Sequence, residues 1–203
     1  MGARPGQGSR THREEKDMGT TIASTAAALS AAALTVGLAG AAHAEQFGID
    51  DPKETGHGSD ILALQVRNAD QNLHVVSYHQ NLRKDPATGS GGRVYIDTDS
   101  EDRGPEYVFV AGYTKGTDFV LLETEGFKPS QWGDAVEQGD YKMVVRYKVD
   151  RVHVTLSRHA IGDPTDVRVA VRASGTRTDG TSHGLVDWVG EKRGFTPWIA
   201  QGW

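Results

Sequence analysis

The stretch richest in potential metal ligands is YIDTDSEDRGPEY, residues 95–107. Ca²⁺ takes roughly six to eight hard oxygen ligands, commonly several carboxylates of one loop together with backbone carbonyls. Asp97 and Asp99 are two positions apart, so they face the same side of an extended segment. The pattern predicts a calcium site with Asp97 and Asp99 as ligands and Asp102 and Glu106 as completing ligands, whereas Glu101 is expected to face solvent.

The acidic stretch does not follow the EF-hand pattern. Counted from Asp97, the sixth position is Asp102 instead of Gly, and the twelfth is Val108 instead of Glu. A second interpretation stays open, in which the charges only solvate a loop and protect a strand end from pairing with another chain. Glycoside hydrolysis needs two acids across a cleft, and nothing in the sequence places a second acid there.

Other catalytic constellations are weak in this chain. His74 and His79 lie five positions apart on one predicted strand and therefore face opposite sides, while His153 is expected on a polar face. Neither H-x-H nor HExxH occurs after residue 44, so these histidines are predicted to be incidental and not zinc ligands. The chain has no Cys, so it offers no thiolate as nucleophile or metal ligand. A non-catalytic protein is therefore favoured.

Aromatic residues in loop-like segments are the better candidates for ligand contacts. Trp132 lies in the segment FKPSQWGD, which is bounded by Pro and Gly, and Tyr113 follows Gly112. Exposed Trp and Tyr rings can stack on the apolar faces of sugars. Trp132 and Tyr113 are predicted to bind a ligand, whereas Trp188 and Trp198 are predicted to fill the core and its open end.

The elements that must position these residues follow a period of two. In YKMVVRYKVD (141–150) and RVHVTLS (151–157), apolar side chains alternate with polar ones, which predicts strands with one buried face. Asp150-Arg151 is predicted to be the hairpin turn between them. Further strands are predicted at 61–67, 73–79, 93–97, 107–112, 118–123, 167–171 and 185–189.

No apolar pattern of helical period persists through three turns, so no long helix is expected. Eight or nine short strands separated by turn-forming segments predict an all-β, antiparallel β-sandwich of immunoglobulin-like or jelly-roll-like type.

The first 44 residues differ from the rest of the chain. Basic residues precede TTIASTAAALSAAALTVGLAGAAHA (20–44), which ends in Ala42-His43-Ala44 as before a signal-peptidase cut. Its apolar run is shorter than the roughly 20 residues of a membrane span. We therefore expect a signal peptide at 1–44, a secreted protein without a membrane span after cleavage, a mobile lead-in at 45–59 and one sandwich domain at 60–203.

Charge and cysteine content limit the function classes. The 203-residue chain has 22 basic and 27 acidic residues, of which residues 1–44 hold four and three, so the remainder carries 18 and 24 and a net charge of −6. This balance gives no electrostatic footprint for nucleic acid or an anionic membrane. Without Cys, the exported fold must rely on burial and hydrogen bonding instead of disulfides.

The order of these segments resembles a known group of sandwiches. A strand ending in YIDTD, then GPEY (104–107), TDFVLLETEGF (117–127), LSRHAIG (156–162) and DVRVAVRAS (166–174) resembles the DOMON-like superfamily, which includes the family 9 carbohydrate-binding modules. The segment FTPW (195–198) also looks like secreted actinobacterial proteins. Some DOMON domains bind haem through a Met and a His, but Met143 is expected at an inward, core position.

This resemblance, together with the loop aromatics and the lack of a catalytic constellation, favours a secreted, non-catalytic module that binds extracellular carbohydrate. The acidic stretch makes Ca²⁺ the one candidate cofactor. The alternative is a protein of the cell envelope that binds another protein through a sheet face or edge.

Overall fold

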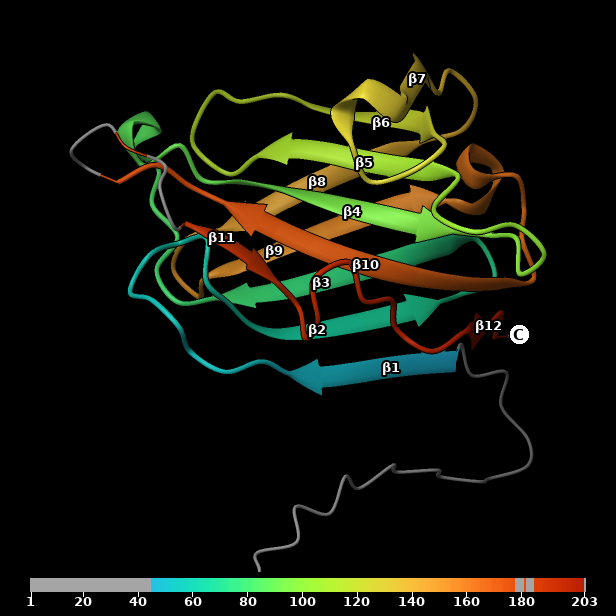
Figure 1. Ribbon diagram of the computed structural model, residues 1–203, viewed down its shortest axis with the longest axis horizontal. Helices are drawn as coiled ribbons and strands as arrows, with labels where there is room; N and C mark the ends of the chain where they lie inside the picture. Colours follow the sequence, from blue (N-terminus) through green and yellow to red (C-terminus); the bar gives the residue numbers. More distant parts are fainter. Residues whose placement is uncertain (1–44, 178–180, 182–184, 203) are drawn as a thin grey trace, which may run out of the picture. The chain divides into compact units, whose positions relative to one another are not determined.

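The computed structural model describes residues 45–177, 181 and 185–202, so the expected signal peptide lies outside the described residues. The strands form two antiparallel sheets packed as a β-sandwich (Figure 1). Sheet A has the order β1–β2–β3–β9–β8. Its strands are β1 (Glu45–Asp50), β2 (Ile61–Asn68), β3 (Asn72–His79), β9 (Arg151–Ser157) and β8 (Tyr141–Arg146).

Sheet B has the order β11–β10–β4–β5–β6–β7, and β12 pairs with β10 beside this path. Its strands are β11 (Val186–Trp188), β10 (Asp166–Ser174), β4 (Gly91–Asp97), β5 (Tyr107–Gly112), β6 (Phe119–Thr124), β7 (Trp132–Ala135) and β12 (Ile199–Ala200). The helical segments of the described residues are three short 3-10 turns, η1 (Pro86–Thr88), η2 (Pro129–Gln131) and η3 (Arg158–Ile161). No helix in this part of the chain is long and apolar enough to cross a membrane.

Alternation along each strand builds the core between the sheets. On β4, Val94 and Ile96 belong to the main core, whereas Tyr95 between them belongs to a separate cluster on the other side of sheet B. Both sheets supply fully buried side chains to the main core, among them Ile61, Leu64, Leu73, Ile96, Phe109, Leu121 and Leu156. Full burial of each such side chain contributes about 1.5–3 kcal/mol before entropic costs.

The predicted all-β antiparallel sandwich is confirmed, and each of the nine predicted strands has a counterpart. Three further strands, β1, β7 and β12, bring the number in the described residues to twelve. The hairpin between β8 and β9 differs from the prediction, because Arg146 pairs with Arg151 and residues 147–150 form the turn. Asp150 adopts a left-handed conformation there, with φ of 46°.

The predicted lead-in is wrong for its first six residues. Residues 45–50 form β1, which pairs along its whole length with β2, and Phe47 lies opposite Val66. Phe47 also packs against the main core. The packing of Phe47 against the core, together with the free edge of β2, makes a strand out of a segment that is largely polar.

Two buried titratable groups hold the ends of β2 and β3, where Ile61 and His79 are register partners. Asp187 Oδ2 accepts a hydrogen bond from the Ile61 backbone N–H at 2.6 Å, and burial raises the pKa of Asp187 to about 6. His79 Nε2 lies 2.8 Å from Ser77 Oγ, and burial lowers the pKa of His79 to about 4.

Candidate functional site

The outer face of sheet B carries a hydrophobic group that we call the outer cluster. Tyr95, Val108 and Ala170 are its buried members. The side chains packed around them are Val110, Leu122, Phe127, Trp132, Trp188 and Phe195. An antiparallel sheet commonly leaves one face to water. Burial on the outer face therefore marks a specialised surface.

Tyr95 organises the outer cluster. Its hydroxyl donates a hydrogen bond to the Phe127 carbonyl at 3.0 Å, and its ring is fully buried. The ring centroid lies 4.8 Å from that of Phe127, and the ring stacks on Trp188 at 5.8 Å with an interplanar angle of 14°. Tyr95 thus ties β4 to β11 and to the loop between β6 and β7.

Arginine side chains lie against the aromatic rings of this face. The Arg93 guanidinium carbon is 4.9 Å from the centre of the Trp132 ring. That of Arg168 lies 4.7 Å from the Phe195 ring and 4.6 Å from the Trp198 ring. Such contacts contribute about 0.5–1 kcal/mol at exposed sites and more where water is excluded. The face therefore combines cations with aromatic surface.

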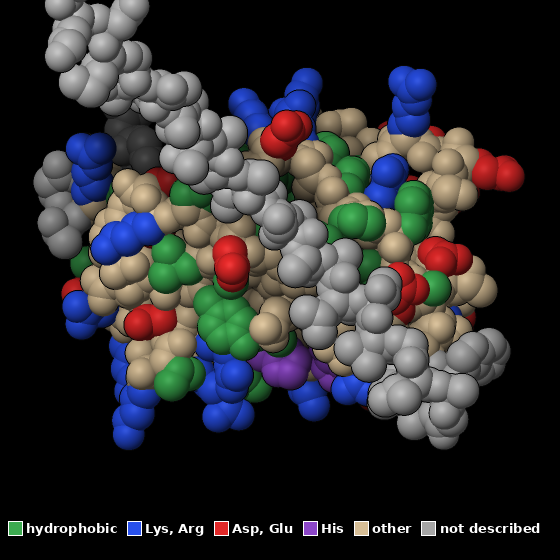
Figure 2. Space-filling view, turned by 90° about the horizontal axis from the view of Figure 1, so that it is seen from below, with side chains coloured by type: hydrophobic (Ala, Val, Ile, Leu, Met, Phe, Trp, Pro, Cys, Tyr) green, Lys and Arg blue, Asp and Glu red, His purple; other side chains and the backbone are tan. Residues whose placement is uncertain are grey.

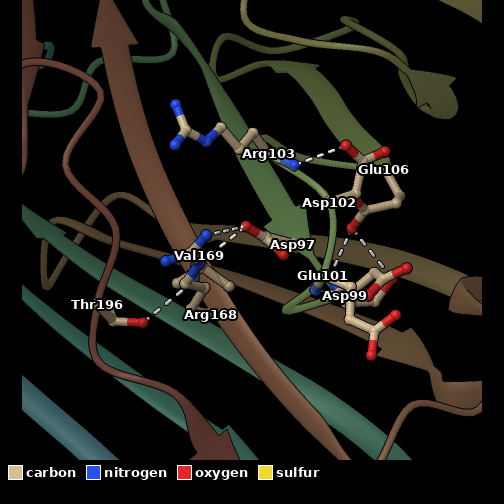
Figure 3. A network of polar contacts seen from close by, with 10 residues as sticks. Asp97, Asp99, Glu101, Asp102, Arg103, Glu106, Arg168, Val169 and Thr196 are labelled. Carbon is tan, nitrogen blue, oxygen red and sulfur yellow. Dashed lines mark hydrogen bonds and ion pairs between the residues drawn. The ribbon is translucent and has the colours of Figure 1, made fainter.

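Asp97 is a structural carboxylate and not an open metal ligand. It is fully buried, and its Oδ2 accepts from Arg168 at 2.8 Å from Nε and 2.6 Å from the terminal nitrogen (Figure 3). Burial raises the pKa of Asp97, while the hydrogen bond from Arg168 opposes that shift. Its other oxygen, Oδ1, is buried without a hydrogen-bond partner among the described residues.

The other predicted calcium ligands engage separate partners in the loop between β4 and β5. Asp99 accepts from the Glu101 N–H at 2.8 Å, and Asp102 from the Arg103 N–H at 2.6 Å. Figure 3 shows Asp97 turned toward β10, whereas Asp99 and Glu101 lie on the far side of the loop. Because β4 ends at Asp97, strand alternation does not carry Asp99 to the same face.

Glu106 is likewise engaged within the loop. Its Oε2 accepts from the Thr98 backbone N–H at 2.6 Å and from the Thr98 hydroxyl at 3.1 Å, and burial raises its pKa. Among the residues that the structure describes, no group of three or more His, Cys, Asp or Glu is placed to hold a metal ion. The four predicted ligands are therefore not brought together, and calcium binding stays a prediction.

A polar hollow of about 490 Å³ opens at the end of β5, β6 and β7, and we call it the polar hollow. Its lining combines three carboxylates, hydroxyl groups, a side-chain amide and one indole. The lining residues are Glu106, Tyr107, Glu123, Thr124, Glu125, Ser130, Gln131, Trp132 and Gly133. Glu123, Glu125, Ser130 and Gln131 are exposed. This mixture offers both hydrogen-bonding groups and an apolar surface.

Gln131 shapes the loop that borders the polar hollow. Its amide nitrogen donates to the Glu125 carbonyl at 3.1 Å, and its backbone carbonyl accepts from the Glu125 N–H at 3.1 Å. A Cβ on Gly126 would lie 2.5 Å from the Gln131 amide nitrogen, so a larger residue there would displace the Gln131 side chain. These local bonds hold Trp132 at the start of β7.

The two predicted ligand-binding aromatics have different outcomes. Trp132 lines the polar hollow and is partly exposed, but Arg93 covers part of its ring and the ring nitrogen is buried. Tyr113 is only 2% exposed, packs edge-on to His79 at 5.3 Å and has a raised pKa because of burial. Its role as an exposed ligand contact is wrong, because the residue after β5 turns into the core.

A histidine pair on the outer face of sheet A went unpredicted. Because β3 pairs with β9, His74 Nδ1 lies 3.2 Å from His153 Nε2, and Thr155 Oγ1 lies 3.4 Å from each nitrogen. Burial lowers the pKa of both histidines, and each is lowered further by nearby cationic side chains. Alternation within each strand places both histidines on a polar face. Their contact with each other follows only from the pairing of β3 with β9.

The edge that carries β1 borders an apolar cleft. Hydrophobic side chains are visible along this edge of the molecule (Figure 2). A cleft of about 370 Å³ lies here between the sheets, lined by side chains that include Phe47 and Ile49 of β1, Val169 and Val171 of β10, and Phe195. Ile49 is 39% exposed. The cleft shares no lining residue with the polar hollow, and its lining is mostly apolar.

Comparison with known proteins adds no family to these observations. No protein-family model matches the chain, and no curated protein matches it. The resemblance to DOMON-like sandwiches therefore remains a prediction. The chemistry of the polar hollow and of the outer face of sheet B is what indicates a function.

Proposed function

We propose that this chain is a secreted, non-catalytic module that binds carbohydrate at the polar hollow. The observation that carries the proposal is the lining of the hollow, which places Trp132 beside exposed carboxylates, hydroxyls and an amide. Sugar rings present hydroxyl groups at their edges and apolar C–H surfaces on their faces. A partly exposed indole among hydrogen-bonding side chains suits both kinds of surface.

The individual groups have distinct roles in this proposal. Glu123 and Glu125 are exposed and accept hydrogen bonds from sugar hydroxyls, while the Ser130 hydroxyl both donates and accepts. Glu106 has one oxygen committed to Thr98, so it supports the wall of the hollow. This engagement favours binding over a catalytic acid, because a proton donor must be free to reach the scissile oxygen.

Affinity electrophoresis in gels that contain soluble neutral polysaccharides tests the proposal. We expect wild type to be retarded by at least one polysaccharide and Trp132→Ala to bind it at least tenfold more weakly, or ~1.4 kcal/mol. Trp198→Ala is the matched control, because Trp198 does not line the hollow. Melting curves establish that both variants are folded. If no neutral or acidic glycan retards wild type, the envelope-protein alternative replaces this function.

A further inference from the structure

Two register pairs on β4 and β10 differ in charge. Arg168 lies opposite Asp97, and four positions along β10, Arg172 lies opposite Arg93. All four side chains are on the outer face, because their positions differ by even numbers. Opposite charges across a ladder stabilise a sheet, and like charges directly opposite each other destabilise it. The sheet therefore has an ordinary ion pair and a repulsive pair on the same face, with the pair Tyr95–Ala170 between them.

Within the described part of the chain, the repulsive pair has no acidic partner. Among the described residues, ion pairs join Arg168 to Asp97 and His159 to Asp163, and neither Arg93 nor Arg172 takes part in one. Arg172 donates to the Ser174 hydroxyl at 3.2 Å. Its pKa is lowered by burial and by the charge of Arg93. Arg93 and Arg172 are two partly buried cations side by side, and no described carboxylate forms an ion pair with either.

Aromatic side chains border the pair on both sides. Trp188 of β11 is the register partner of Arg172, and the Trp132 ring lies against the Arg93 guanidinium. A guanidinium binds a carboxylate or sulfate through two parallel hydrogen bonds. Flanking indoles supply surface for the ring that carries such a group. Trp132 also lines the polar hollow, so it is shared between the two regions.

We propose that Arg93 and Arg172 form an anion subsite that takes a carboxylate or sulfate group of an acidic polysaccharide. The identification of a polysaccharide rests on the proposed carbohydrate-binding function. The bound anion neutralises the repulsion between the two guanidinium groups. In this proposal, the two arginines bind the ligand, and their mutual repulsion lowers the stability of the protein without it.

Affinity electrophoresis with charge-matched probes tests the subsite. Polygalacturonate is compared with its methyl ester, and dextran sulfate with dextran, so each pair differs only in the anionic group. We expect wild type to bind at least one charged form tenfold or more tightly than its neutral form. Arg93→Gln and Arg172→Gln are each expected to abolish this preference. Arg67→Gln, an exposed position on sheet A, is the matched control and keeps it.

Thermal unfolding without polysaccharide gives a second measurement. Arg172→Gln is expected to raise the melting temperature by about 1–3 °C, since it removes like-charge repulsion. Sodium sulfate is expected to stabilise wild type more than Arg172→Gln at matched ionic strength. The comparison between variants corrects for the general stabilisation that sulfate gives all proteins. A lower melting temperature in Arg172→Gln together with equal sulfate effects would overturn the subsite.

The outcomes separate this inference from the carbohydrate proposal. Binding of neutral and acidic forms with equal affinity, lost in Trp132→Ala, overturns the anion subsite and leaves carbohydrate binding intact. A sulfate effect that depends on Arg172, without retention by any polysaccharide, keeps an anion subsite and overturns its carbohydrate ligand. Equal retention of a single-stranded DNA oligonucleotide and of the acidic polysaccharides indicates unspecific charge attraction and overturns the inference.

Discussion

The two outer faces of the sandwich differ in what lies on them. On sheet A, His74, His153 and Thr155 form a polar group that remains partly open to solvent, apart from buried Thr155. On sheet B, Tyr95 is fully buried beneath Phe127 and Trp188. Among the described residues, buried hydrophobic clusters lie on both faces of sheet B, whereas those of sheet A lie on its inner face. A second buried face is not needed to close a sandwich, so its presence supports the choice of this face for the proposed binding function.

The largest expected effect comes from removing the centre of the outer cluster. Tyr95→Ala deletes a fully buried ring and its hydrogen bond to Phe127, and we expect a loss of about 3–5 kcal/mol in unfolding free energy. The matched change on the outer face of sheet A is Val76→Ala, expected to cost about 1 kcal/mol or less. Urea unfolding measures both. Equal losses of unfolding free energy in the two variants would contradict the proposed difference between the outer faces of sheets A and B.

The second prediction concerns acid and the core side of sheet A. His79 has an ordinary pKa near 6.5 when unfolded and about 4 when folded. The unfolded chain therefore binds the proton more tightly, and stability falls as the pH drops from 6.5 to 4. The shift corresponds to about 3 kcal/mol, with little further loss from this group below pH 4.

Asp187 works in the opposite direction over part of this range. Its folded pKa, about 6, exceeds its ordinary value of 3.8, so this group adds stability as the pH falls from 6 toward 4. The measurement is therefore made on Asp187→Asn with and without His79→Gln, by urea unfolding at several pH values. If His79→Gln leaves the pH dependence of the unfolding free energy unchanged, protonation of His79 does not cause the loss of stability in acid.

The third prediction compares the two register pairs on β4 and β10. Arg168→Leu leaves the buried Asp97 carboxylate without its partner, and we expect a loss of about 2–3 kcal/mol at neutral pH. The value is reduced from that of a fully buried pair, because Arg168 is 29% exposed. Arg172→Leu, on the same strand and face, should be neutral or stabilising. Urea unfolding of both variants decides whether the two arginines differ in role.

The smallest expected effect is that of calcium. The carboxylates of Asp97, Asp99, Asp102 and Glu106 engage different partners, so we expect melting temperatures in millimolar Ca²⁺ and in chelator to agree within about 1 °C. Asp99→Asn serves as the control. An increase of several degrees with calcium in wild type, lost in Asp99→Asn, would establish the predicted calcium site.

The fold was largely predictable because it depends on a local signal. Alternation over five or more residues is visible in segments such as 151–157, and it is imposed by the geometry of a half-buried strand. The strands that escaped prediction, β7 and β12 among them, have four and two residues. These strands form because they pair with a free strand edge or are held by hydrogen bonds of a neighbouring loop. Such contacts are tertiary and leave no local pattern in the sequence.

The candidate site was predictable only in part, because it depends on pairing between distant strands. Loop context predicted that Trp132 lies at an accessible surface, whereas the same kind of context misplaced Tyr113. The opposition of Arg93 and Arg172 requires the register of β4 against β10. No local pattern contains that register, since it is set by the whole sheet.

The distance between paired strands also has a kinetic consequence. β3 bonds to β9 across 79 residues at the histidine pair, and β4 bonds to β10 across 71 residues at the Arg168–Asp97 pair. Chains dominated by such non-local contacts fold slowly, typically in milliseconds to seconds, because loop closure precedes the contacts that reward it. Until β9 and β10 are available, β3 and β4 each keep an unpaired edge that can capture a strand of another chain. Aggregation during refolding is therefore expected to compete with formation of the central pairs of both sheets.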